Sequence, residues 1–257
     1  MSDVTVSIAD SIATVALSHP GKLNAIDTAM WRRLRAVFDE LTRDTSLRCV
    51  IVRGADGNFA AGADIEEFPA VRANTQQGIA YHEDLIAPAL QAIAECLHPT
   101  VAAIDGVCVG GGLEIACSSD IRLAQHGSRF GIPINRLGFP LAPRELQGLL
   151  QLVGKARTLE ILLEGRVFDA EEALAKGLLH RIVADVHGAA SEAAQRIAQG
   201  APLAARANKA MVRRLAPRAE PLDEHELKTA YDFLQSSDYR EGVQSFLAKR
   251  PPDFQGR

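Results

Sequence analysis

Two glycine-rich segments, Phe59-Ala60-Ala61-Gly62-Ala63-Asp64 and Gly110-Gly111-Gly112-Leu113-Glu114, decide how this chain of 257 residues is interpreted. Each follows a short apolar run and leads into a stretch with helical character. Because glycine has no side chain and the first N–H groups of a helix have no partner within it, both turns can present bare backbone donors. Two such turns facing each other would form an oxyanion hole, with the carboxylate of Glu114 three residues beyond one donor.

Other interpretations of these turns fit less well. A dinucleotide-binding GxGxxG pattern that starts at Gly110 would need glycine where Ile115 stands, and no Gly-Lys-Ser/Thr follows to make a phosphate-binding loop. Asp64 is expected to cap a helix, with Glu67 completing a capping box, rather than to act as a catalytic acid. Glu114 could serve only the helix dipole, worth about 0.3–1 kcal/mol. Its apolar neighbours and the adjacent hole favour a functional role.

The composition indicates a globular protein without an obvious polyanionic partner. Hydrophobic residues make up 47% and charged residues 23%, and the 28 basic and 32 acidic residues give a net charge of −4. No basic leader followed by an apolar stretch occurs, and no apolar run approaches the ~20 residues of a membrane span. The four cysteines lie in apolar runs without metal-ligand spacing. We therefore expect a cytoplasmic protein with no metal, nucleic-acid or membrane partner.

Strands and helices alternate in the first part of the chain, which predicts an α/β fold with parallel strands. An opening hairpin and a helix capped by Asp27 should precede a long helix over Gln76–Cys96 that is interrupted near Pro88. The remaining expected strands are Cys49–Val52, Val101–Ile104, Ile121–Ala124 and Arg129–Ile132. Helical patterns dominate beyond Pro143, and a boundary near residue 200 divides the chain into residues 1–200 and 201–257. The three amphipathic helices of the second part are expected to pack against a neighbouring subunit.

The motifs resemble those of the enoyl-CoA hydratase/isomerase (crotonase) superfamily, and the similarity extends along nearly the whole chain. The segments that carry it are Pro20-Gly21-Lys22-Leu23-Asn24-Ala25, Phe59–Ile65, Gly110–Glu114, Phe130-Gly131-Ile132-Pro133 and Glu241–Phe254. The resemblance implies a crotonase-like spiral of ββα units with a helical C-terminal trimerisation region. It also implies an acyl-CoA substrate, no cofactor beyond the coenzyme A of that substrate, and assembly as a homotrimer or a dimer of trimers.

Roles for individual residues follow from the same resemblance. The N–H groups of Ala63 and Gly111 would hold the thioester oxygen, and Glu114 would be the acid/base group. The coenzyme A would be contacted by the Ala61 carbonyl and by the side chains of Lys249, Phe246 and Lys22.

The chain departs from the family at the second catalytic glutamate, which would follow Pro133 directly. Ile134 stands there and cannot transfer a proton. The polar residues that could replace it are Glu83, Asp84, Asn135, Arg136, Arg144 and Glu145. We expect Glu83 and Asp84 to lie on a solvated helix face, Glu145 to be an ordinary first-turn helix residue, and His82 and His98 to be packed. Glu66 is a further departure, because many relatives carry lysine there.

Enoyl-CoA hydration through an oxyanion-hole-stabilised enolate, with Glu114 as acid/base, is the first hypothesis. Because Ile134 stands where the second catalytic acid would be, the reaction could instead be that of an isomerase, decarboxylase, lyase or thioester hydrolase. A non-catalytic acyl-CoA-binding homologue is a further alternative. A serine peptidase of the related spiral fold is discounted, since no GxSxG occurs and Ser118-Ser119 has no assignable histidine.

Overall fold

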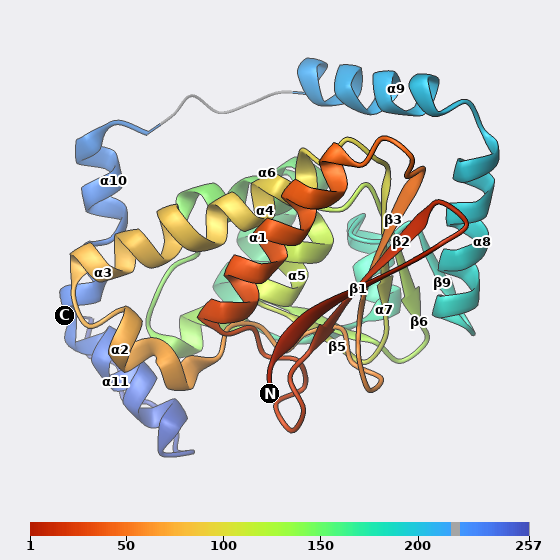
Figure 1. Cartoon of the computed structure of the whole chain (residues 1–257). Helices are drawn as coiled ribbons and strands as arrows, with labels where there is room; N and C mark the ends of the chain where they lie inside the picture. The colour runs from red at the N-terminus through yellow and green to blue at the C-terminus, as the bar shows by residue number, and fades with distance from the viewer. Residues whose placement is uncertain (217–221, 257) are drawn as a thin grey trace.

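The computed structural model describes residues 1–216 and 222–256 and contains a twisted sheet covered on both faces (Figure 1). The six strands are ordered β1-β2-β3-β4-β6-β9. Only the first pair is antiparallel, as the predicted hairpin requires. The strands span Asp3–Ala9 (β1), Ile12–Ser18 (β2), Cys49–Gly54 (β3), Thr100–Ile104 (β4), Ile121–Gln125 (β6) and Arg181–Val183 (β9). A second sheet has the order β5-β7-β8, over Val107–Val109, Arg129–Gly131 and Phe168–Asp169.

Helices on opposite faces of the larger sheet divide the core into two clusters. Val50 and Val52 of β3 belong to the main cluster, with residues of α1 (Thr28–Arg43), α4 (Ala87–Ala94) and α5 (Gly111–Cys117). Cys49 and Ile51 point the other way, against α8 (Val186–Gln199). The alternation along a strand that is buried on both faces explains why its sequence is continuously apolar.

The predicted irregularity near Pro88 is confirmed, and it has a definite form. Helix α3 (Thr75–Ile79) continues into α4 through a π-helical turn over Ala80–Ile86. Pro88 cannot donate a backbone hydrogen bond, so the wider turn ends at the first residues of α4. The π-helical turn brings Tyr81 and His82 inward, where both are buried.

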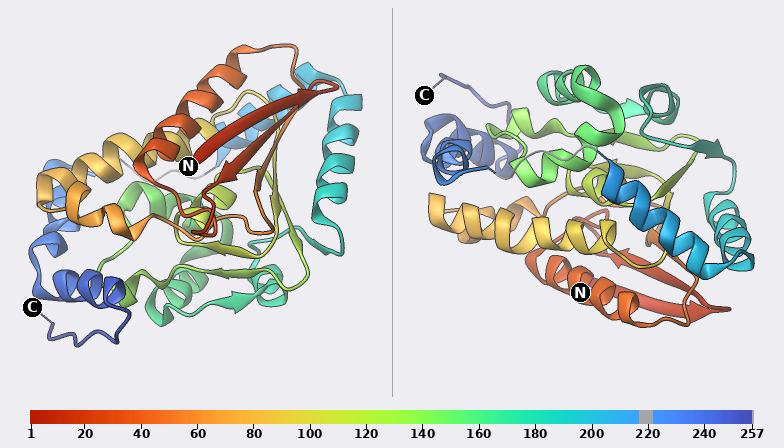
Figure 2. Two further views of the ribbon diagram at one scale, coloured as in Figure 1. Left: turned by 60° about the horizontal axis from the view of Figure 1, so that its bottom comes forward. Right: turned by 90° about the horizontal axis from the view of Figure 1, so that it is seen from above.

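The later helices complete the fold at two ends of the molecule. They are α6 (Pro143–Glu164, broken at Gly154), α7 (Ala170–Lys176), α9 (Pro202–Leu215), α10 (Glu224–Ala230) and α11 (Ser237–Leu247). Figures 1 and 2 show α10 and α11 at the end remote from α8, beside α3 and the short helix α2 (Phe68–Val71). A hydrogen bond of 2.8 Å from the Tyr231 hydroxyl to Glu83 Oε1 ties this C-terminal part to the π-helical turn. Within the described residues, no helix is long and apolar enough to cross a membrane.

The predicted capping box at the first glycine turn is wrong in one half. Asp64 does cap the short 3-10 turn Ile65–Glu67, since its carboxylate accepts from the Glu66 N–H at 3.3 Å. The Glu67 carboxylate instead accepts from the Thr28 N–H at 2.7 Å. It therefore attaches this turn to the start of α1, a tertiary contact that local spacing does not reveal.

Asn24 fixes the position of the loop that precedes the first glycine turn. Its buried side chain donates to the carbonyl oxygens of Ala55 and Asn58, at 2.8 and 2.7 Å, and accepts from the His19 N–H at 2.9 Å. Its backbone has a φ of 58°, in the left-handed region that asparagine tolerates better than most residues. Asn24 therefore has a structural role in the Asn-Ala segment, because its side chain holds the loop that precedes the first glycine turn.

Replacing Asn24 by alanine should lower the free energy of unfolding by about 1–3 kcal/mol, because the two partly buried carbonyls that its amide group holds lose their donor. Urea denaturation followed by circular dichroism measures the change. Asn208→Ala, at an exposed position of α9, is the matched control and should leave stability unchanged or slightly higher. Equal stability of the two variants would show that Asn24 does not support the turn.

Candidate active site

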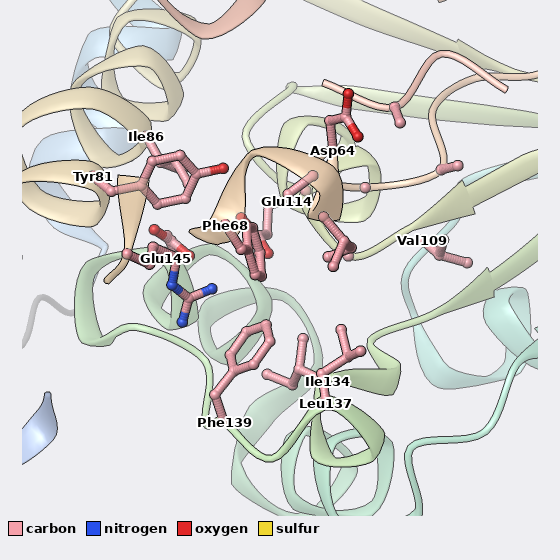
Figure 3. A pocket seen from close by; sticks show the side chains of 18 of the residues that line it. Asp64, Phe68, Tyr81, Ile86, Val109, Glu114, Ile134, Leu137, Phe139 and Glu145 are labelled. Carbon is pink, nitrogen blue, oxygen red and sulfur yellow. The ribbon is translucent and has the colours of Figure 1, made fainter. Parts of the chain in front are cut away.

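The two glycine turns meet at the wall of a cavity of about 330 Å³. Its lining comes from the first turn, the π-helical turn, the start of α5, the segment from Pro133 to Glu145, and Phe246 of α11. Figure 3 shows the side chains of Glu114 and Glu145 in this pocket, with aromatic and aliphatic side chains around them. A mostly apolar cavity with a few convergent polar groups is typical of a small-molecule site.

Close backbone packing brings the two turns together. A Cβ atom on Gly62, whose φ is 96°, would lie 3.2 Å from the Val109 carbonyl oxygen and 3.7 Å from the Gly111 nitrogen. A Cβ on Gly112 would lie only 2.3 Å from the Ala60 carbonyl oxygen. Side chains at these two positions would push the turns apart, which explains why glycine is required there.

Both backbone donors foreseen in the sequence are free. The Ile26 N–H donates to the Gly62 oxygen at 2.7 Å, and the Asp64 N–H donates to the Ile26 oxygen at 2.9 Å. These two bonds form a parallel bridge that turns the Ala63 N–H away from Ile26. Within residues 1–216 and 222–256, neither the Ala63 N–H nor the Gly111 N–H has a hydrogen-bond partner. Two unused donors beside a cavity can receive an oxygen that develops negative charge.

Glu114 lies in the first turn of α5, with its side chain against the cavity. It is 6% exposed and its carboxyl group forms no hydrogen bond with any described residue. Burial raises the pKa of Glu114 well above its ordinary value, and the negative charge of Glu145 raises it further. A carboxyl group in this state keeps its proton to a higher pH than an ordinary glutamate, as is common for groups at functional sites.

The structure places a second carboxyl group, that of Glu145, in the same cavity. Glu145 belongs to the first turn of α6, as the sequence predicts, but it is 5% exposed rather than solvated. Burial raises the pKa of Glu145 to about 8, Arg72 opposes the shift, and the charge of Glu83 adds to it. The expectation that Glu145 is an ordinary helix residue is therefore incomplete. The apolar residues that share its helix face, Ala142 three positions before it and Leu149 four positions after it, were the sequence signal for its burial.

His82 is the partner of Glu145 and was expected only to be packed. Its Nδ1 lies 2.7 Å from Glu145 Oε1, and both side chains are almost fully buried. Burial and the charge of Arg72 hold the pKa of His82 well below its usual range, so the imidazole is neutral. Because Glu145 binds a proton tightly and His82 weakly, the pair holds one proton at neutral pH.

None of the other candidate acids or bases contributes to the cavity lining. Glu83 accepts from Tyr231 and lies 3.5 Å from Arg144. The other three are exposed or bonded elsewhere: Asp84 faces solvent, Asn135 donates to the Leu163 oxygen at 2.9 Å, and Arg136 is exposed. His98 is packed as expected, with Nε2 3.0 Å from the Leu41 oxygen.

The residues expected at the coenzyme A are brought together only in part. Ala61, Lys22 and Phe246 line the cavity, whereas Lys249 lies beyond the end of α11, exposed and outside the lining. The Lys22 ammonium lies 2.7 Å from Asp64 and 2.8 Å from Glu66, and both acids raise the pKa of Lys22. Glu66, noted as a departure, thus binds the lysine at the mouth of the cavity.

A sequence model described as enoyl-CoA hydratase/isomerase matches residues 7–257, and the chain belongs to this family, whose members act on CoA thioesters. A probable enoyl-CoA hydratase of Rhizobium meliloti is 31% identical over 252 residues, covering 96% of this chain and 95% of the relative.

Solved structures agree with the fold. An enoyl-CoA hydratase/carnitine racemase from Magnetospirillum magneticum has a TM-score of 0.81 and 45% identity, with 99% of this chain and 96% of that chain covered. A methylmalonyl-CoA decarboxylase in complex with 2-nitronate-propionyl-CoA has a TM-score of 0.88 and 28% identity, with 99% and 98% covered. The crotonase-type α/β fold predicted from the motifs is therefore confirmed. No group of three or more potential metal ligands occurs within the described residues.

The stability of the protein should depend on pH through Glu145. A folded-state pKa of about 8, against about 4.5 in the unfolded chain, means that the native state binds more protons between these values. Stability should therefore fall as the pH rises from 4.5 to 8, by up to about 3–5 kcal/mol at ~1.4 kcal/mol per pKa unit.

Urea denaturation at intervals of pH tests this dependence. Glu145→Gln should show a distinctly shallower fall than the wild type. Glu192→Gln, at an exposed position of α8, should follow the wild-type curve. Parallel curves for the wild type and Glu145→Gln would show that Glu145 is ionised normally in the folded protein.

Proposed function

We propose that the protein adds water to a 2-enoyl-CoA thioester, with Glu114 and Glu145 as the acid/base pair. The observation that carries this proposal is the presence of two buried carboxyl groups with raised pKa values in one cavity with two free backbone donors. Hydration needs a base for water and an acid for the α-carbon, and a coupled pair that shares protons supplies both. The family membership supports the thioester as the electrophile.

The reaction follows from the positions of these groups. The Ala63 and Gly111 N–H groups bind the thioester oxygen and polarise the conjugated double bond. The carboxylate of the pair takes a proton from water, the water oxygen bonds to the β-carbon, and the π electrons move to the thioester oxygen as an enolate. The carboxyl group of the pair then gives its proton to the α-carbon, and the enolate collapses. The pair ends with as many protons as it began with.

Glu145 takes over the task that Ile134 cannot perform. Ile134 is 9% exposed and lines the cavity, and its hydrocarbon side chain cannot donate a proton at this position of the cavity wall. Glu145 reaches the same cavity from α6, a different element, and its carboxyl group is hydrogen-bonded to His82 Nδ1. His82 therefore acts as a positioning residue that orients the carboxyl group of Glu145.

We propose the remaining contacts on the same basis. Ala61 would offer its carbonyl to the coenzyme A, with Lys22 and Phe246 beside it, and the thioester requires no further cofactor. Lys249 would reach a phosphate of the coenzyme only from its exposed position beyond α11.

We also propose that residues 201–257 form a helical region through which subunits assemble as a trimer or a dimer of trimers. Support comes from α9, none of whose side chains is buried within the described chain. Its exposed apolar residues are Leu203, Met211, Val212 and Leu215.

Double-bond isomerisation is the second candidate reaction. The apolar residues of the segment Ile134–Leu141 form much of the cavity lining, which leaves little that would bind water. A pair of carboxyl groups could then remove a proton from the α-carbon and return a proton to the γ-carbon, with no water added. The substrate would then be a 3-enoyl-CoA.

Purified protein should cause the absorbance of conjugated 2-enoyl-CoA thioesters to fall, because the addition of water removes the conjugated double bond. Glu114→Gln and Glu145→Gln should each lower kcat by about 100-fold or more, since each removes one proton-transfer group. The double variant should lose little beyond the worse single variant, because the two groups act together. Glu192→Gln on α8 is the control and should retain wild-type rates.

Other outcomes identify the alternatives. Conversion of 3-enoyl-CoA without hydration of any 2-enoyl-CoA would establish the isomerase instead. Tight binding of acyl-CoA in a calorimeter without any turnover would establish a binding protein.

A further inference from the structure

Arg72 is a buried cation in the wall of the same cavity, and the proposed reaction gives it no task. It follows α2 directly, is 1% exposed and is among the largest fully buried side chains of the described chain. It lines the cavity together with Glu145 and His82. Fully buried arginines are rare unless they are paired, so its surroundings need an explanation.

Aromatic rings cover the guanidinium group. The guanidinium carbon lies 4.3 Å from the ring centre of Phe68 and 4.2 Å from that of Phe139. Tyr239, Phe233 and Tyr81 follow at 5.1, 5.6 and 6.0 Å. Cation–π contacts of this kind stabilise the charge. They do not accept the hydrogen bonds that the N–H groups in the guanidinium plane can donate.

The donors of Arg72 are largely unused. Nε, Nη1 and Nη2 are all buried, and none donates a well-formed hydrogen bond to a described residue. The Tyr239 hydroxyl lies close enough for a weak hydrogen bond, which opposes the rise that burial causes in the pKa of Tyr239. Glu145 attracts Arg72 electrostatically, but its carboxyl group is hydrogen-bonded to His82 and not to the guanidinium. Burial lowers the pKa of Arg72, which reflects the cost of holding a cation without a well-formed hydrogen bond.

We propose that Arg72 binds a carboxylate carried by the acyl group, so that the substrate is the CoA monothioester of an unsaturated dicarboxylic acid. The planar guanidinium matches a carboxylate with two parallel hydrogen bonds, and the aromatic rings hold it in orientation. The ligand would complete a charge pair that the free protein leaves open. This inference rests on the proposed function, because it assigns the substrate class of the same cavity.

The competing explanation is that Arg72 only balances Glu145 and holds the aromatic rings together. In that case a substitution would affect all acyl chains alike. The decisive quantity is therefore the ratio of kcat/KM between two substrates of equal chain length that differ only in the terminal carboxylate. The CoA monothioester of hex-2-enedioic acid and hex-2-enoyl-CoA form such a pair, and pent-2-enedioyl and pent-2-enoyl thioesters test a shorter chain.

The wild type should prefer the carboxylated member of at least one pair by about 10–100-fold, as expected for charge-assisted hydrogen bonds in a buried site. Arg72→Met should abolish or reverse this preference, and the ratio carries the test because the loss of the Arg72 charge also alters the pKa of Glu145 and with it the rate for both substrates. Arg72→Lys keeps the charge but not the planar fork, and should retain part of the preference. Arg196→Met, which removes the same charge from an exposed position of α8, should leave the ratio unchanged.

A wild type that prefers the neutral member of both pairs, or an Arg72→Met variant that slows both members equally, would overturn the inference. If Arg72→Met does not fold by circular dichroism, the ratio for Arg72→Lys decides.

Calorimetry separates this inference from the proposed reaction. Even without any hydration, the wild type should bind the saturated adipyl monothioester of CoA more tightly than hexanoyl-CoA, and the Arg72 variants should lose that difference. Equal affinities in the wild type would contradict the role of Arg72 whatever reaction the protein catalyses.

Discussion

The close approach of two backbone turns is the constraint on which the rest of the structure depends. Gly112 lies so close to Ala60 that no side chain would fit, and Gly62 packs tightly against Val109 with a positive φ that side chains rarely allow. The bridge from Ile26 then orients Ala63 so that its N–H group stays free. The parallel sheet, the Asn24 hydrogen bonds and the start of α5 all serve to hold these few backbone atoms in place.

Burial changes the acidity of the two carboxyl groups that lie beside these glycine turns. Glu114 and Glu145 come from different helices, and their shared apolar surroundings raise the pKa of both. His82 and Arg72 lie beside them, one hydrogen-bonded to Glu145 and the other acting through its charge. Ile134 contributes only an apolar side chain to the cavity, whereas Glu145 places a carboxyl group in the same cavity from another element.

Sequence alone predicted what local patterns encode. The glycine turns, the Asp27 cap and the interruption near Pro88 all follow from backbone chemistry, and the structure contains them. The short strands β5, β8 and β9 carry too few residues to show a periodicity, and they were missed. Glu145 and His82 were undervalued, and Arg72 was overlooked, because their burial depends on tertiary packing. The π-helical turn and α11 create that packing, and only Glu145 had apolar neighbours in the sequence that indicated its burial.

The proposed reaction depends on the polarisation of a thioester carbonyl by the Ala63 and Gly111 N–H groups. Infrared difference spectroscopy of an unreactive conjugated acyl-CoA, labelled with carbon-13 at the carbonyl, measures that polarisation directly. Binding to the protein should shift the carbonyl stretch to lower wavenumber than in water, because two aligned donors withdraw electron density from the C=O bond. A bound thioester whose carbonyl stretch matches the value in water, or lies higher, would contradict the central claim.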